Sequence, residues 1–232
     1  MTRSATAIAL FAMAVALAPL VVASDAWLNF IVLSLFGAQM AQAWNVLAGF
    51  GGQFSFGHAV FFGTGAYAMA VLQVRYGVNA WAALPAALAA GAAVGVFIGA
   101  LTFRYGLRGS YFALATLAFA EIFRILANTF QFTGAGAGLQ IPLTGRPATL
   151  QFDARAGYLY VVLAFVVAGL AIATWLKHSR FGAWLQAVRD NEEAAQALGV
   201  DAYRVKLGAI AISGAMMAAA GAFYLQYLHY ID

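Results

Sequence analysis

The 232-residue sequence contains no cysteine, which excludes disulfides, thiolate chemistry and metal sites built from cysteine. Charged residues are also scarce, at 9% of the chain, whereas soluble domains average about a quarter. The 12 basic and 8 acidic side chains cannot cover the surface of a water-soluble protein of this size, in which 64% of the residues are hydrophobic. The composition therefore predicts an integral membrane protein.

Motifs for catalysis are missing as well. The sequence has no G-x-x-x-x-G-K-[ST] phosphate loop, so nothing indicates that the chain itself binds ATP. His, Asp and Glu do not cluster at metal-ligand spacing, and no Ser/His/Asp set stands out. We therefore expect no enzyme, no metal and no cofactor. The net charge of +4 does not indicate nucleic acid, because the basic residues stand at the ends of apolar runs, near lipid headgroups.

Apolar runs predict about seven membrane spans, since each span needs about 20 apolar residues. The runs cover residues 4–24, 27–48, 55–74, 76–103, 109–131, 156–176 and 207–231. The expected fold is all-α, a polytopic transmembrane helical bundle that forms a single domain over residues 1–232. The first run also resembles a secretory signal, but it is longer than the usual core of about 7–15 residues, so we expect a retained span.

The basic residues predict the orientation of these spans. With the N-terminus in the cytoplasm, eight basic residues fall in cytoplasmic segments and three on the other side. The eight are Arg3, Arg104, Arg108, Lys177, Arg180, Arg189, Arg204 and Lys206, and the three are Arg75, Arg146 and Arg155. This asymmetry follows the positive-inside rule. Residues 177–206 are then cytoplasmic, and the glycine-rich loop 133–157 is external.

Three glycines are spaced four residues apart in the fourth span, at Gly91, Gly95 and Gly99. This spacing places them on one face of a helix. Small residues on such a face let helix backbones approach closely in lipid. The stripe therefore predicts helix packing and says nothing about a substrate.

A polar segment rich in glycine separates the second and third spans, and it contains Gln53, Ser55, Gly57 and His58. Irregular backbone at membrane depth is tolerated only where protein or a water-filled cavity satisfies it. One interpretation is an ordinary cytoplasmic turn in which His58 bonds to a neighbouring helix. The other is a broken segment that lines a transport path.

Two ionisable residues, Glu121 and Arg124, lie one helical turn apart inside the fifth span, so their side chains can meet. Ionisable residues in a span are costly and often functional. A mutually neutralised pair can equally hold two helices together. We favour this structural role over a proton relay, because the spans contain no further acidic residues to extend a relay.

The cytoplasmic segment 177–206 predicts two short helices. Its first part has the apolar spacing of an amphipathic helix, at Phe181, Trp184, Leu185 and Val188. Asp190 is expected to cap a second helix over residues 191–198, with Glu193 at the capping-box position and Gly199 at the end. A helix of this length is not stable alone, so we expect support from its flanks or from a partner protein.

Three segments resemble signatures of branched-chain amino acid ABC-transporter permeases. They are residues 52–67 (GQFSFGHAVFFGTGAY), 107–124 (LRGSYFALATLAFAEIFR) and 179–199 (SRFGAWLQAVRDNEEAAQALG). The resemblance implies a permease subunit of an ATP-driven importer in the bacterial inner membrane. It favours the transport-path interpretation of residues 53–58. Members of this family continue further, so the resemblance marks the chain as lacking their C-terminal part.

The resemblance also implies partners. The cytoplasmic segment 177–206 matches the coupling loop of the family, which docks on cytoplasmic ATPase subunits. The docking residues that the resemblance implies are Asp190, Glu192, Glu193, Ala194, Ala195 and Gly199. A periplasmic substrate-binding protein would deliver the substrate, and a second, related permease would complete the path. Membrane lipid surrounds the spans, and no nucleic acid is expected.

Two alternatives to this function remain. Permeases for urea or short amides look similar, so the resemblance is weaker for the substrate than for the family. A secondary transporter driven by an ion gradient through Glu121 and His58 is a different class. The broken glycine segment argues against a scaffold without transport activity.

Overall fold

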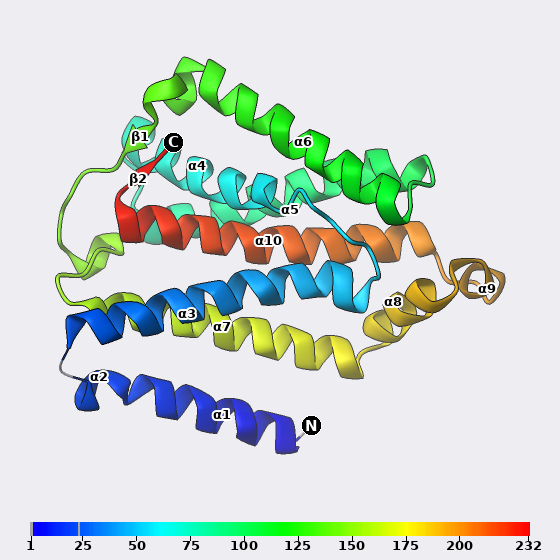
Figure 1. Cartoon of the computed structure of the whole chain (residues 1–232), viewed down its shortest axis with the longest axis horizontal. Coiled ribbons are helices and arrows are strands. Elements are labelled where there is room, and N and C mark those ends of the chain that lie inside the picture. Colours follow the sequence, from blue (N-terminus) through cyan, green and yellow to red (C-terminus); the bar gives the residue numbers. More distant parts are fainter. Residues whose placement is uncertain (1, 23) are drawn as a thin grey trace.

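The computed structural model describes residues 2–22 and 24–232, most of which are helical. The long helices lie side by side in one bundle, with the short α8 and α9 at one end (Figure 1). The helices are α1 (Thr2–Ala16), α2 (Ala18–Val21), α3 (Asp25–Asn45), α4 (Ala59–Tyr76), α5 (Ala80–Arg104), α6 (Gly109–Thr129), α7 (Arg155–His178), α8 (Arg180–Asp190), α9 (Glu192–Ala197) and α10 (Ala202–Leu228). The predicted all-α membrane bundle is confirmed.

Short elements connect these helices. α3 continues into a π-helical turn, η1 (Val46–Phe50), before an extended segment leads to α4. The loop between α6 and α7 holds the 3₁₀ turns η2 (Gln131–Thr133), η3 (Ala135–Ala137) and η4 (Pro147–Thr149) and the strand β1 (Leu139–Gln140). β1 pairs antiparallel with β2 (Tyr230–Ile231), at the end of the bundle opposite α9 (Figure 1).

Six of the described helical segments are long and apolar enough to cross a membrane. They are Ser4–Val21, Asp25–Phe50, Ala80–Arg104, Gly109–Thr129, Arg155–His178 and Ala202–Leu228. They correspond to six of the seven predicted spans. The remaining prediction, residues 55–74, coincides with the 18-residue α4, whose Thr64, Gln73 and Arg75 lower its hydropathy. Residue 23, within the first predicted span, lies outside the described residues.

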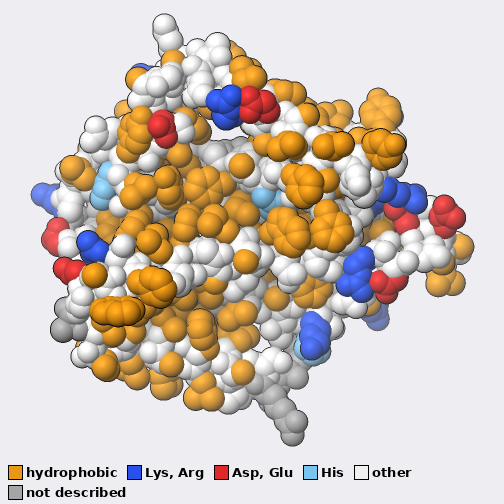
Figure 2. All heavy atoms as spheres, viewed as in Figure 1, with side chains coloured by type: hydrophobic (Ala, Val, Ile, Leu, Met, Phe, Trp, Pro, Cys, Tyr) orange, Lys and Arg blue, Asp and Glu red, His pale blue; other side chains and the backbone are white. Residues whose placement is uncertain are grey.

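Helix α10 occupies the centre of the bundle. In the most apolar 18-residue stretch of α10, 67% is buried inside the structure. The corresponding share is 33% or less in each of the other five candidate spans. It contacts α3, α4, α5 and α7. Hydrophobic side chains are spread over the whole visible face of the bundle, and charged side chains gather mainly toward its ends (Figure 2). This distribution suits a bundle surrounded by lipid, where the outside is apolar as well as the core.

The glycine stripe of α5 faces α10. A Cβ added at Gly91 would lie 2.3 Å from the Ala218 Cβ, and one added at Gly95 would lie 2.7 Å from the Ile210 carbonyl oxygen. At Gly99 it would lie 2.8 Å from the Ile210 side chain. The two helix backbones thus approach as closely as only glycine permits.

Helix α6 is the exception to this close packing. Its buried residues, Phe112, Ala113 and Thr116, all lie in its first half. Beyond them α6 runs at an angle to α4 and lies farther from it toward the end that carries β1 (Figure 1). A cavity is lined by residues of both helices.

Replacement of Gly95 by leucine tests the packing of the stripe. We expect Gly95→Leu to lower the melting temperature and the yield of folded protein in detergent, because the side chain collides with the α10 backbone. Overpacking of this kind costs about 1–3 kcal/mol. Ala93 is exposed on the same helix, so Ala93→Leu is the matched control. Equal melting temperatures for the two variants would contradict the role of the stripe.

Candidate functional site

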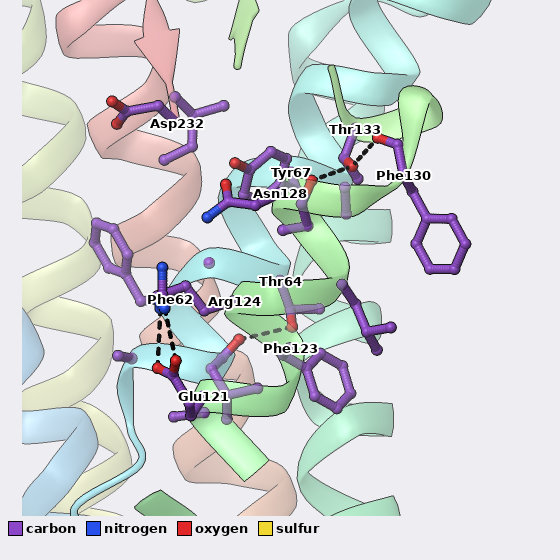
Figure 3. Close-up of a pocket in the computed structure, with 18 of the residues that line it drawn as sticks. Phe62, Thr64, Tyr67, Glu121, Phe123, Arg124, Asn128, Phe130, Thr133 and Asp232 are labelled. Carbon is purple, nitrogen blue, oxygen red and sulfur yellow. Dashed lines mark hydrogen bonds and ion pairs between the residues drawn. The ribbon is translucent and has the colours of Figure 1, made fainter. Parts of the chain in front are cut away.

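A cavity of about 1730 Å³ lies between α4 and α6. Ligand pockets usually measure about 300–1,000 Å³, so this space exceeds that of one small solute. Its lining includes Gly63, Thr64 and Tyr67 of α4, and Phe36 and Met40 of α3 close one side. Most of the remaining lining is apolar, and α6 contributes more of it than any other element. Figure 3 shows the polar groups among it.

Two charged side chains project into this cavity from α6. Arg124 donates from Nε to Glu121 Oε2 at 2.9 Å and from Nη2 to Glu121 Oε1 at 2.6 Å. Their side chains remain 63% and 54% exposed, and Figure 3 shows the pair on the cavity wall. The pair therefore does not tie two helices together as we expected, because both partners belong to α6 and face the cavity.

The cavity ends near the strand pair. Ile231 and Asp232 line it, and Ile231 pairs with Leu139 across the two strands. Tyr230 donates from its hydroxyl to the Ala137 carbonyl oxygen at 3.0 Å. Burial lowers the pKa of His229, the residue directly after α10, below its ordinary value. The loop after α6 is thus fastened to the end of α10.

The segment between η1 and α4 lies outside the cavity lining. Gln53, Ser55 and His58 are buried, and a Cβ at Gly57 would lie 1.9 Å from the Thr116 carbonyl oxygen. Ser213 of α10 donates to the Ala43 carbonyl oxygen at 2.7 Å, and its Oγ lies 2.8 Å from His58 Nε2. Because the single hydroxyl proton is engaged, His58 is the donor in that second bond.

Although none of these four residues lines the cavity, Ala59 and Val60 follow directly and do line it. The segment is also unusual in the pairing of its polar atoms. Gln53 Oε1, Ser55 Oγ and His58 Nδ1 are buried and have no hydrogen-bond partner among the described residues. Buried polar atoms are nearly always paired, so this arrangement is costly.

Helix α8 packs against the same segment. Of its predicted apolar face, Leu185 and Val188 are buried, whereas Trp184 is about half exposed. Arg189 donates from Nη1 to the Gly49 carbonyl oxygen at 3.0 Å. A Cβ at Gly52, whose φ is +65°, would lie 2.4 Å from Arg189 Cγ. The predicted cytoplasmic segment is therefore in direct contact with the turn before α4.

The cap of the next helix differs from the prediction. Asp190 is the last residue of α8 and pairs with Arg189, and Asn191 is the N-cap of α9. The Asn191 Oδ1 accepts from the Ala194 N–H at 3.0 Å. The predicted capping box is wrong, because a cap at Asn191 moves the third helical position from Glu193 to Ala194. Gly199 follows α9 with a φ of +88°, in the left-handed region where glycine is favoured.

A buried ion pair that we did not predict anchors α9. Glu192 Oε1 lies 2.7 Å from Lys206 Nζ, and Glu192 Oε2 lies 3.1 Å from Arg108 Nε. The Lys206 side chain is only 2% exposed, and its Nζ lies 5.1 Å from the centre of the Phe103 ring. A buried ammonium needs a partner, and Lys206 at the start of an apolar run was a signal for one.

The predicted coupling residues consequently divide into two groups. Glu192 and Ala195 face the bundle and are largely buried. Glu193 and Ala194 are exposed, as are Asp190 at the end of α8 and Gly199. The exposed group is the part that another protein can reach.

A known family matches most of the chain. The model of the family described as branched-chain amino acid transport system / permease component covers residues 26–232. The chain belongs to this family. The resemblance read from the three sequence segments is thereby confirmed, and the chain is a multi-pass membrane protein of a transport family.

Two relatives in this permease family are named high-affinity branched-chain amino acid transport system permease protein LivM. The protein of Escherichia coli (strain K12) is 35% identical over 204 residues, and that of Salmonella typhimurium (strain LT2) is 34% identical over 204 residues. Each match covers 78% of this chain and 48% of the relative, so the chain spans about half the length of these relatives. No solved structure matches.

Removal of the Lys206 charge tests the anchor of α9. We expect Lys206→Met to leave Glu192 short of one partner and to destabilise the fold by about 2 kcal/mol, as for a lost bond to a charged group. The melting temperature should fall, and hydrogen exchange in α9 should accelerate.

Arg204→Met is the control for this variant. It breaks the Arg204–Asp201 pair on the same helix, whose side chains are 84% and 52% exposed. Exposed pairs contribute about 0–1 kcal/mol. If Lys206→Met and Arg204→Met had the same effect, the buried pair would not be the anchor.

Proposed function

We propose that this chain is the membrane permease subunit of an ATP-driven ABC importer for branched-chain, aliphatic amino acids in the bacterial inner membrane. The observation that carries the proposal is α9, which a buried ion pair fixes to the bundle while Glu193 and Ala194 stay uncovered. Membership of the permease family and the relatives named LivM support the transport function and its substrate class.

Cytoplasmic ATPase subunits dock on the exposed residues of α9 in this proposal. Displacement of α9 then reaches the transport path through existing contacts. α9 packs on α8, and Arg189 of α8 holds the backbone at Gly49 and Gly52. A ligand or partner shifts such an equilibrium only if it contacts the two states differently, and α9 offers the ATPase that contact.

The cavity between α4 and α6 is the transport path, and Gln53, Ser55, Gly57 and His58 close its cytoplasmic end. Their position directly before Ala59 supports this role. Their unpartnered polar atoms support it further, since an alternative conformation could pair them. A periplasmic substrate-binding protein delivers the substrate to the opposite end of the path, and a second, related permease completes the path. The chain itself does not hydrolyse ATP.

The orientation follows from the same proposal and from the basic residues. The end of the bundle with α8 and α9 lies in the cytoplasm with the N-terminus, and the end with β1 lies outside (Figure 1). Because the chain has no native cysteine, single cysteines report on each end. Gln196 and Leu143 are exposed and serve as positions.

We expect an impermeant thiol reagent to label Leu143→Cys in intact cells and to leave Gln196→Cys unlabelled until the membrane is opened. The reagent cannot cross the bilayer, so the pattern gives the orientation directly. The reverse pattern would place α9 outside and remove the proposed contact with an ATPase.

Transport itself is tested on the complex of this chain with the ATPase, second permease and binding protein, reconstituted in liposomes. We expect uptake of labelled leucine, and we expect it to require ATP on the side of the membrane that α9 faces. Uptake driven by an ion gradient without ATP would identify a secondary transporter. Uptake of urea or acetamide instead of leucine would assign a different cargo to the same machine.

Gly199→Val in the same complex tests coupling. We expect ATP-driven uptake to fall at least fivefold with unchanged ATPase activity of the free subunits, because a β-branched residue resists the left-handed conformation that ends α9, at about 1–2 kcal/mol. Gly77 has a similar φ of +63° at the opposite end and, like Gly199, open space around it. Gly77→Val is therefore the matched control, and equal losses in both variants would count against coupling through α9.

A further inference from the structure

We propose that Glu121 and Arg124 bind the head group of a zwitterionic α-amino acid in the cavity. Arg124 holds the carboxylate of the ligand and Glu121 its ammonium group. The inference rests on the proposed transport function and adds the residues and the chemistry of recognition.

The pair lies deep within its helix. Glu121 is twelve residues after Gly109, the first residue of α6, and Arg124 is five residues before Thr129, the last. At about 1.5 Å per residue, these positions are about 18 Å and 8 Å from the two helix ends. Charged groups within a span are costly and usually face a cavity, as these do.

The geometry of the pair leaves room for a ligand. A guanidinium has five N–H donors, and the two bonds to Glu121 use only two of them. Nη1 carries two N–H donors without a partner among the described residues. A second carboxylate can accept from Nη1 and Nη2 together along their shared edge of the guanidinium. The oxygens of Glu121 likewise keep lone pairs for an ammonium group.

The charge of the pair selects the kind of ligand. Glu121 and Arg124 together are neutral, and each is in contact only with the other among the described charged groups. A free anion or cation would leave a net charge in an apolar cavity, which is costly. A zwitterion adds one charge of each sign and keeps the site neutral. Asp232, the other charged residue of the lining, lies apart from the pair in Figure 3.

The rest of the cavity suits the remainder of such a molecule. Tyr67 and Asn128 present polar groups that have no hydrogen-bond partner among the described residues (Figure 3). Three aromatic rings form an apolar cluster on the lining, with centroids 6.2 Å apart for Phe36 and Phe62, 6.1 Å for Phe36 and Tyr224 and 5.3 Å for Phe62 and Tyr224. A ligand with a charged head and an aliphatic side chain matches both kinds of lining.

A purely structural role explains the pair less well. Both residues belong to one helix, and an exposed pair three residues apart stabilises a helix only slightly. Such a contribution is small beside the cost of two ionisable groups within a span.

Binding of labelled leucine to the purified whole chain in lipid nanodiscs tests the proposal. We expect unlabelled leucine to compete at least tenfold better than leucinamide, which lacks the carboxylate, or 4-methylpentanoate, which lacks the ammonium group. Arg124→Gln and Glu121→Gln should each weaken leucine binding at least tenfold. The matched control is Arg204→Gln, which removes one charge from an exposed pair of the same spacing outside the cavity and should bind leucine normally.

A charge exchange separates recognition from folding. The double variant E121R/R124E keeps an ion pair on the same helix face, so its melting temperature should match that of the unaltered chain. Leucine binding should still fall at least tenfold, because both recognition groups have changed places. Normal binding by this variant, equal competition by the three compounds, or no leucine binding by the unaltered chain would each overturn the proposal. ATP-driven uptake by the complex is measured independently, so the proposed function can stand if this site fails.

Discussion

Close backbone contact between α10 and its neighbours is the constraint on which the other features depend. Lipid offers little hydrophobic drive for helix association, so the bundle relies on packing between small residues. Gly91 and Gly95 bring α5 against α10, and Gly65 does the same for α4, where a Cβ would lie 2.2 Å from the Ala218 carbonyl oxygen. Three functional regions take their positions from α10. Lys206 holds α9, Ser213 holds the turn before α4, and Tyr224 lines the cavity.

Patterns along the chain predicted the features that depend on neighbouring residues. Apolar runs predicted the long helices, and the four-residue spacing of glycines matches the face that meets α10. The cap of α9 was missed because Asp190 and Asn191 are both good N-cap residues, and the choice depends on where α8 ends. The hydropathy of α4 is lowered by Thr64, Gln73 and Arg75, of which Thr64 lines the cavity and Arg75 is exposed.

Features formed by segments that are distant in the sequence could not be predicted from such patterns. Glu192 is joined to Lys206 and Arg108, and Arg108 comes from the loop before α6. The charges of the Glu121–Arg124 pair were visible in the sequence, but the cavity they face is formed by residues of α3, α4, α6 and α10 that are distant in the sequence. The family resemblance supplied the function class, and packing decided which residues of each motif point inward.

The tight contacts of α6 with the turn before α4 lie in its first half, and this has a mechanical consequence. Thr116 is held there by the Phe56 N–H, which donates to its Oγ1 at 3.2 Å, and by the tight contact of its carbonyl oxygen with Gly57. Thirteen residues of α6 extend beyond this clamp to Thr129, a lever arm of about 20 Å. A tilt of about 10° at the clamp would move the far end of α6 by about 3 Å, on the order of the width of a water molecule. Small adjustments of the polar turn would thus be amplified at the end of α6 near the strand pair, where the following loop is fastened to α10.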